Sequence, residues 1–224
     1  MGEYYSDCLS AWRLKKCYDI APKRTRQYLE AEISYILSKI DQQDSVLELG
    51  CGYGRILRRL VPFCTKITGI DISLESLALG LNELQPILGR NLLQVNADTL
   101  PFANEQFDFV LCVQNGISAF KLDSLSLVKE SMRVTRSGGL CLFSSYSEKF
   151  WGHRLEWFRL QSEQGLIGPI NWEETRNGII VCEDGFRATT YRAKDFKELA
   201  ARLGVRCQVI EVDDSCLFCE IPVK

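Results

Sequence analysis

The chain has 224 residues, of which 46% are hydrophobic and 25% charged, so a single domain can bury an ordinary core. Its net charge of -2, without a strongly basic patch, argues against nucleic acid as a partner, and no apolar run is long enough to cross a membrane. The opening residues MGEYYSDCLS lack the apolar stretch of a secretory signal. We therefore expect a cytoplasmic protein whose 10 cysteines are reduced.

Helical patterns, with apolar residues three and four positions apart, alternate with short apolar runs that are typical of buried strands. In chain order we predict a helix over 22–40, a strand over 44–50, a helix over 55–63, a strand over 66–72, a helix over 74–84, strands over 91–98 and 107–114, a helix from Asp123 or Ser124 to Val134, and a strand over 140–146. Ser73 is expected to cap the helix at 74–84, and Gly138 and Gly139 to end the last helix. This alternation predicts a doubly wound α/β fold, with a parallel sheet covered on both faces.

After Tyr146 the alternation breaks. The pattern predicts a helix over 149–165, a hairpin over 178–191 around Asp184 and Gly185, and a helix over 193–204 that Gly204 ends. Two final strands, over 205–212 and 216–223, are expected to form a closing antiparallel pair. The predicted fold therefore contains a helix-plus-hairpin insertion after its fifth strand.

Chemically distinctive residues follow four of the predicted strands. The first strand leads into VLELGCGYGR (46–55), which holds Glu48, Gly50, Cys51, Gly52 and Gly54; Asp71 ends the second strand, Asp98 and Thr99 the third, and Gln114 the fourth. Ligands of parallel sheets bind at the carboxyl ends of the strands, where glycines let main-chain amides touch the ligand and an acid can accept both hydroxyls of a ribose. Gly50 alone could simply join a strand to a helix, but acids after two further strands predict a nucleoside-containing ligand.

The spacing of the glycines helps to choose the nucleoside. A dinucleotide loop reads G-x-G-x-x-G, whereas Arg55 stands here in place of the third glycine, and the chain has no phosphate-binding G-x-x-x-x-G-K-[ST] motif. A carboxylate at Glu48 suits an ammonium group and repels a pyrophosphate. These features point to an amino-acid nucleoside.

The segments VLELGCGYGR, GIDIS, VNADTLPF, FDFVLCVQNGI and GGLCLFSSY resemble successive motifs of the class I S-adenosylmethionine-dependent methyltransferases, roughly over residues 44–146. The resemblance implies a Rossmann-like, mostly parallel seven-stranded sheet with an antiparallel last strand, and S-adenosyl-L-methionine as cofactor. It implies that Asp71 binds the ribose and that Asp98 approaches the adenine amino group, with Ile72, Thr99 and Gln114 in the same site. The QNGI that follows the fourth strand departs from the Asn/Asp-Pro-Pro-aromatic pattern of many amino-group methylases, which argues against methylation of bases or protein glutamine.

We expect one methyltransferase-like domain over residues 1–224. It comprises an N-terminal helical lid segment (1–40), a cofactor-binding core (44–146), a substrate-lobe insertion (147–191) and a closing helix with a strand pair (192–224). The insertion is rich in aromatic residues that could cover a small acceptor: Phe150, Trp151, Trp157, Phe158, Trp172 and Phe186. The predicted function is methyl transfer to a small-molecule acceptor; alternatives are a non-catalytic S-adenosylmethionine-binding regulatory protein and, against the glycine spacing, an NAD(P)-dependent oxidoreductase.

No catalytic residue can be assigned from the sequence. His153 is the single histidine, and such a residue is more often a packing or surface residue than a base. Arg154 and Glu156 are expected to be solvated, while Tyr4, Tyr5 and Tyr18 could either line the site or only fold the lid. Cys216 and Cys219 have the C-x-x-C spacing, but on a strand they would point to opposite faces, so we predict no metal site. The oligomeric state is left open.

Overall fold

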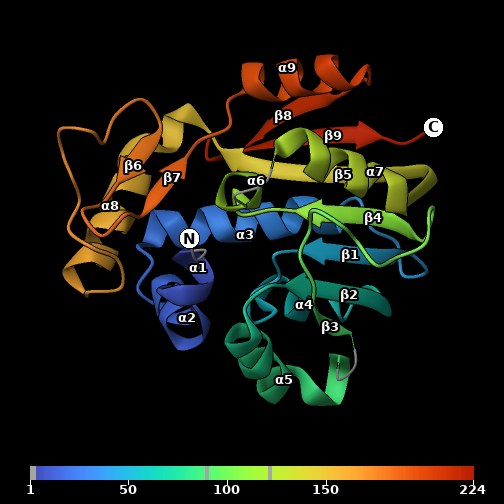
Figure 1. Cartoon of the computed structure of the whole chain (residues 1–224), viewed down its shortest axis with the longest axis horizontal. Coiled ribbons are helices and arrows are strands. Elements are labelled where there is room, and N and C mark those ends of the chain that lie inside the picture. Colours follow the sequence, from blue (N-terminus) through green and yellow to red (C-terminus); the bar gives the residue numbers. More distant parts are fainter. Residues whose placement is uncertain (1–3, 89–90, 121–122) are drawn as a thin grey trace.

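Seven strands form one sheet in the computed structural model, which describes residues 4–88, 91–120 and 123–224. The strands of this sheet are β1 (Ser45–Leu49), β2 (Lys66–Asp71), β3 (Leu92–Gln94), β4 (Phe107–Cys112), β5 (Thr135–Tyr146), β8 (Gln208–Val212) and β9 (Cys216–Pro222). Their order is β3-β2-β1-β4-β5-β9-β8; neighbours among β1 to β5 pair in parallel, and β9 is antiparallel to both β5 and β8. The predicted seven-stranded α/β sheet with an antiparallel last strand is therefore confirmed (Figure 1).

Helices cover both faces of this sheet. One face packs against α3 (Lys23–Leu37), α4 (Arg55–Leu60) and α5 (Leu74–Leu88), and the other against α7 (Ser124–Val134) and α9 (Ala193–Leu203). Within β1, Val46 belongs to the first core, whereas Leu47 and Leu49 belong to the second. This two-sided burial is the reason that the strands are almost continuously apolar.

Two helix boundaries follow from local capping. The backbone N–H of Ser76 donates to Ser73 Oγ at 3.2 Å, and Gly204 ends α9 with a φ of 67°, both as predicted. The prediction that Gly138 and Gly139 end α7 is wrong: the helix ends at Val134, and both glycines lie inside β5. A Cβ at Gly139 would lie 2.6 Å from the carbonyl oxygen of Asp108, so this glycine serves the close approach of β5 to β4.

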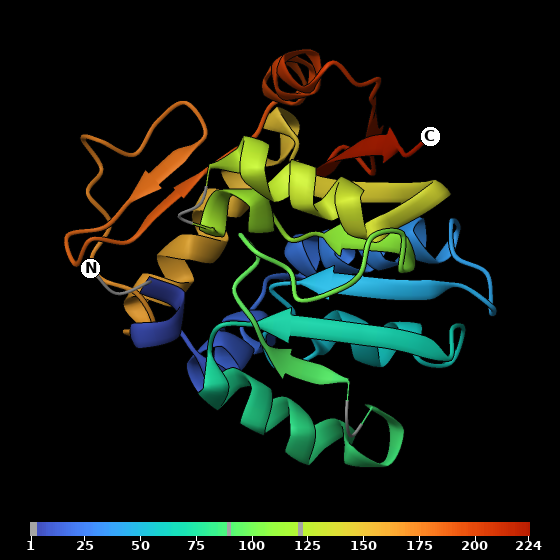
Figure 2. The same ribbon diagram turned by 45° about the vertical axis from the view of Figure 1, so that its right-hand side comes forward.

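Two further regions lie at the carboxyl edge of the parallel strands, the edge to which the arrowheads of β1 and β2 point in Figure 2. The N-terminal segment contains α1 (Tyr4–Asp7) and α2 (Ala11–Asp19). The second region is the insertion after β5, residues 147–191, which we call the lobe. It contains a 3₁₀ turn η1 (Glu148–Phe150), α8 (Trp151–Glu163), β6 (Ile179–Val181) and β7 (Arg187–Thr189). The predicted helix-plus-hairpin insertion is therefore confirmed. Among the described helices, none is both long and apolar enough to span a membrane.

The two regions are joined by hydrogen bonds. The indole N–H of Trp157 donates to the carbonyl oxygen of Cys17 at 2.8 Å, and the Arg13 guanidinium donates to the carbonyl oxygens of Gly165 and Leu166. The phenol of Tyr4 donates to the carboxylate of Asp184 in the hairpin turn. The N-terminal segment and the lobe therefore form a continuous cover over the end of the sheet.

The C-x-x-C pair lies on β9, and its two thiols face opposite sides of the sheet. Cys216 packs in the core with α3 and α4, and Cys219 in the core with α7 and α9. The predicted divergence of these side chains is confirmed. In the described part of the chain, no three or more His, Cys, Asp or Glu side chains form a cluster able to hold a metal ion.

Candidate active site

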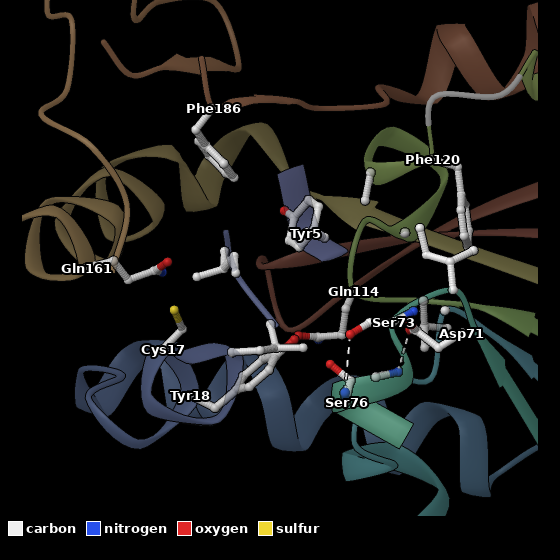
Figure 3. Close-up of a pocket in the computed structure, with 18 of the residues that line it drawn as sticks. Tyr5, Cys17, Tyr18, Asp71, Ser73, Ser76, Gln114, Phe120, Gln161 and Phe186 are labelled. Carbon is white, nitrogen blue, oxygen red and sulfur yellow. Dashed lines mark hydrogen bonds between the residues drawn. The ribbon is translucent and has the colours of Figure 1, made fainter. Parts of the chain in front are cut away.

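A cavity lies at the carboxyl ends of β1, β2 and β4, beneath the cover of the N-terminal segment and lobe (Figure 3). We call its two sides the sheet wall and the cover wall. The sheet wall includes Gly50, Gly52, Asp71, Ile72, Ser73, Ser76 and Gln114; the cover wall includes Tyr5, Leu9, Leu14, Cys17, Tyr18, Trp157, Phe158, Gln161 and Phe186. The cavity has a volume of about 140 Å³ and is open to solvent on one side. Val113, Gly116, Ala119 and Phe120 add an apolar part on the side of the sheet, so the polar groups of that wall gather around Asp71, Ser73, Ser76 and Gln114, whereas the cover wall is mainly apolar.

The glycine loop turns tightly at the base of the sheet wall. Gly50 has a φ of 71° and Gly52 a φ of 54°, in the left-handed region where side chains other than glycine are strained. A Cβ at Gly50 would also lie 3.0 Å from the Phe120 ring. The Cys51 backbone N–H donates to the carbonyl oxygen of Ile70 at 2.9 Å, which ties the loop to β2. The glycines therefore let this backbone form part of the cavity surface.

Asp71 lies next to this loop on the sheet wall. Its carboxylate accepts one hydrogen bond from the backbone N–H of Gly52 and one from that of Ser73, each at 2.8 Å (Figure 3). Burial raises the pKa of Asp71, and these backbone hydrogen bonds oppose the rise. Because each carboxylate oxygen can accept a second hydrogen bond, Asp71 can hold the loop and also receive ribose hydroxyls.

Glu48 occupies a different place from the one expected of a partner for an ammonium group. Its side chain is only 4% exposed and is not part of the cavity lining, and its Oε2 has no hydrogen-bond partner within the described residues. Burial raises its pKa to about 8; nearby Glu32 and Asp71 add to the rise, and Arg55 opposes it. Glu48 therefore lies beneath the glycine loop, in the interior of the domain.

Two other loop residues also fall outside the cavity lining. Cys51 is 5% exposed and packs in the core, and Gly54 has a φ of 78° and caps α4. Asp98 and Thr99 are exposed and lie beyond β3, which ends at Gln94. The Asp98 backbone N–H donates to Asn96 Oδ1 at 3.3 Å. A contact between Asp98 and the adenine amino group stays a prediction.

Gln114 follows the end of β4 at Cys112 and lies on the sheet wall, where a buried glutamate that the sequence did not reveal holds it. Its backbone N–H donates to Glu32 Oε1 at 3.0 Å, and its carboxamide donates to the same carboxylate and to Tyr28 Oη. Ser144 Oγ also donates to Glu32, whose pKa is raised by its complete burial in α3. Only the fold brings α3, β4 and β5 together, so the local helical pattern carried no sign of this role.

The lobe corrects one sequence prediction. Arg154 was expected to be solvated but is fully buried, because the hairpin and β5 cover it on both sides. Its guanidinium lies 4.3 Å from the centre of the Tyr146 ring and donates to the carbonyl oxygen of Gly178 at 2.9 Å and to Thr190 Oγ1 at 2.5 Å. Arg154 therefore fastens the hairpin to α8.

His153 does not line the cavity. Its side chain is about half exposed, and its Nδ1 lies 3.9 Å from the carboxylate of Glu156, which is also exposed. Neither side chain belongs to either wall, so the geometry gives His153 no position from which to act as a base.

The cover wall was also predicted only in part: Tyr5, Tyr18 and Trp157 line the cavity, whereas Trp151 does not.

Comparison with known proteins supports the assignment of the fold and of the family. A family model described as a methyltransferase domain matches residues 46–139, the segment that carries the glycine loop, Asp71 and Gln114. Over these residues the chain is recognised as a class I S-adenosylmethionine-dependent methyltransferase domain. The cofactor of this family is S-adenosyl-L-methionine, and the donors and acceptors of the sheet wall suit an amino-acid nucleoside.

Individual relatives agree with this assignment. The chain is 29% identical over 143 residues to malonyl-[acyl-carrier protein] O-methyltransferase from Marinomonas sp., a match that covers 61% of this chain and 50% of the relative. A crystal structure of a Pyrococcus horikoshii protein has a TM-score of 0.67 at 20% identity and covers 100% of both chains. The N-methyltransferase NodS from Bradyrhizobium japonicum, solved with S-adenosyl-L-homocysteine, has a TM-score of 0.57 at 17% identity over 98% of this chain and 93% of NodS. The chain spans about half the length of the first curated relatives that it matches.

Proposed function

We propose that this protein transfers the methyl group of S-adenosyl-L-methionine to a small-molecule acceptor that binds against the cover wall. The observation that carries the proposal is the division of one cavity into a polar sheet wall, which holds the family's cofactor motifs, and an apolar wall contributed by the N-terminal segment and lobe. The Marinomonas relative is named as an O-methyltransferase, which supports the reaction class. The position of the cavity, between the cofactor motifs and an apolar cover, suits a small molecule beside the cofactor.

The cofactor supplies an electrophilic methyl group on a sulfonium and leaves as a neutral thioether. The residues of this chain have the task of binding and alignment. Asp71 and the backbone at Gly50 and Gly52 hold the nucleoside on the sheet wall. Trp157 and Phe158 cover the acceptor and exclude water, so that its nucleophile is held in line with the methyl group.

No strong base faces the acceptor. Among the described residues that line the cavity, Asp71 is the only carboxylate, and no histidine is present. Burial raises the pKa values of the phenols of Tyr5, Tyr18 and Tyr146, which keeps them protonated at neutral pH. The acceptor atom therefore arrives unprotonated or loses its proton to water, and catalysis comes from alignment and desolvation.

The lack of a base among these lining residues also favours a second candidate function, a regulatory protein that binds S-adenosylmethionine without turnover. Calorimetry with S-adenosylmethionine, S-adenosylhomocysteine and NAD tests the shared part of both proposals. We expect micromolar binding of the first two ligands and none of NAD. Binding of NAD alone would instead support the oxidoreductase alternative.

Turnover separates the enzyme from the binding protein. The protein is incubated with isotope-labelled methyl donor and a small-molecule extract, and mass spectrometry follows both S-adenosylhomocysteine and newly labelled products. We expect a labelled product that disappears when Asp71→Ala replaces the wild-type protein. Cofactor binding without any labelled product from extracts of several sources would favour the regulatory role.

The proposed setting is a reducing, cytoplasm-like compartment. All 10 cysteine thiols are free, and most are buried among apolar side chains. Burial raises the pKa of Cys17 to about 12, so that the thiol on the cover wall is not a ready nucleophile. This arrangement is typical of proteins that do not depend on disulfides.

A further inference from the structure

The cover wall contains one polar side chain that is buried and has no protein partner. Gln161 lies on α8, is only 3% exposed, and points its carboxamide into the cavity between Phe186 and Cys17 (Figure 3). Within the described residues, no hydrogen bond is found from this carboxamide to another side chain, and its polar atoms face the cavity and are not among the fully buried unpaired atoms. The carboxamide is therefore free to pair with a polar group of a molecule that enters the cavity.

The neighbouring groups on the cover wall cannot provide that partner. Trp157 uses its indole N–H on the carbonyl oxygen of Cys17, and Phe158 and Phe186 offer only apolar rings. The Cys17 thiol is a weak hydrogen-bonding group. Besides the phenols of Tyr5 and Tyr18, Gln161 is thus the hydrogen-bonding side chain of a wall whose other members are mainly apolar.

The charge of the lining limits what that molecule can be. Of the described residues around the cavity, only Asp71 carries a charge, and it lies on the sheet wall among the cofactor motifs. A charged acceptor on the cover wall would lose its hydration without gaining a counter-ion, which is strongly unfavourable. A neutral molecule avoids this cost.

We propose that Gln161 determines acceptor specificity, by binding a single hydroxyl, carbonyl or amide group of a neutral and otherwise apolar acceptor. This proposal rests on the proposed function, because it assigns the cover wall to the acceptor. The apolar body of the acceptor packs against Phe158 and Phe186, and its polar group pairs with the carboxamide. A molecule of the same shape without that polar group leaves Gln161 unpaired and is rejected.

A matched pair of probes tests this assignment without turnover. Ligand-observed NMR measures the affinities of p-ethylphenol and ethylbenzene for protein saturated with S-adenosylhomocysteine. A buried hydrogen-bonding group left unpaired costs about 1–3 kcal/mol, and 1.4 kcal/mol is a factor of ten, so the wild type should prefer p-ethylphenol by about tenfold or more. In Gln161→Leu this preference should fall below about threefold, with ethylbenzene bound at least as tightly as before.

Two further measurements separate recognition from a structural role. Gln164→Leu, at an exposed position three residues further along, is the matched control and should keep the wild-type preference. The Tm of ligand-free Gln161→Leu should not fall, because its carboxamide makes no contact that folding needs. A Tm lower by several degrees would make Gln161 a structural residue and overturn the proposal.

Failure of this inference is distinguishable from failure of the proposed function. If S-adenosylhomocysteine binds but millimolar p-ethylphenol does not, or if the preference survives in Gln161→Leu, the role of Gln161 is refuted and the cofactor site stands. If calorimetry detects no S-adenosylhomocysteine binding to folded protein, the proposed function itself is refuted, and the inference that rests on it falls with it.

Discussion

Replacing Glu48 with Gln should stabilise the protein in alkaline solution and leave its stability in acid almost unchanged. The carboxylate is buried beneath the glycine loop, and its pKa is raised from 4.5 to about 8 in the folded protein. In the unfolded chain the same group ionises near its ordinary pKa. Between these two values the folded protein holds a proton that the unfolded chain has released. The stability that this proton provides is complete below the unfolded pKa and is lost as the pH rises to the folded pKa.

The size of the effect follows from the width of this window. One pH unit corresponds to about 1.4 kcal/mol, so a window from 4.5 to about 8 sets an upper limit of roughly 5 kcal/mol. Glutamine resembles the neutral acid at every pH. The difference in the free energy of unfolding between Glu48→Gln and wild type should therefore be small near about pH 5 and reach about 2–5 kcal/mol in favour of the variant near about pH 8.5.

Urea unfolding at both pH values measures this difference, with Glu198→Gln, at an exposed position on α9, as the matched control. The affinity for S-adenosylhomocysteine should change less than about threefold in Glu48→Gln, since a buried group outside the cavity wall makes no direct contact with the cofactor. Equal stability differences at the two pH values would refute the effect of burial. A loss of affinity of tenfold or more, about 1.4 kcal/mol, would restore Glu48 as a partner for the ammonium group.

Three other substitutions test separate parts of the molecule. Asp71→Ala should weaken S-adenosylhomocysteine binding by about 30-fold or more in calorimetry, because two backbone amides and the ribose hydroxyls lose their acceptor; an unchanged Kd in folded protein would place the ribose elsewhere. Trp157→Ala should reduce methyl transfer more than it reduces cofactor affinity. Trp151 lies outside the cavity, so Trp151→Ala should leave both quantities close to wild type. Equal losses of methyl transfer in the two variants would remove this part of the lobe from the acceptor site. Arg154→Leu should lower the free energy of unfolding by about 2–4 kcal/mol in urea titrations, because three hydrogen bonds from the guanidinium, to the carbonyl oxygens of Gly178 and Ala188 and to Thr190 Oγ1, are lost; unchanged stability would mean that the hairpin does not depend on this residue.

Local patterns in the sequence were sufficient for the frame of the protein. The largely apolar segment at 45–49 predicted a buried strand, and Val46 and Leu47 do enter opposite cores. The glycine loop and Asp71 predicted the cofactor wall, because the carboxyl ends of neighbouring parallel strands must meet at one edge of the sheet. These features depend on residues close together in the chain, and the cofactor family followed from them.

Tertiary packing decided which side chains reach the cavity. Glu48 follows the alternation of β1 into the interior, so its carboxylate is buried and lies outside the cavity lining. Arg154 lies on α8, whose apolar residues are not gathered on one side of the helix, because both the hairpin and α3 cover it. A helical pattern reveals burial only when one side of the helix faces water.

The acceptor wall was the least visible part of the protein in its sequence. Tyr5, Cys17 and Gln161 are separated by many residues, and each is ordinary in its own segment. The sequence by itself determined the alternating strands and helices, the turn of the glycine loop and the family, because periodicity and backbone conformation act over a few residues. Only the folded chain decided what faces the acceptor, because the N-terminal segment and the lobe make that wall by packing against each other across the end of the sheet.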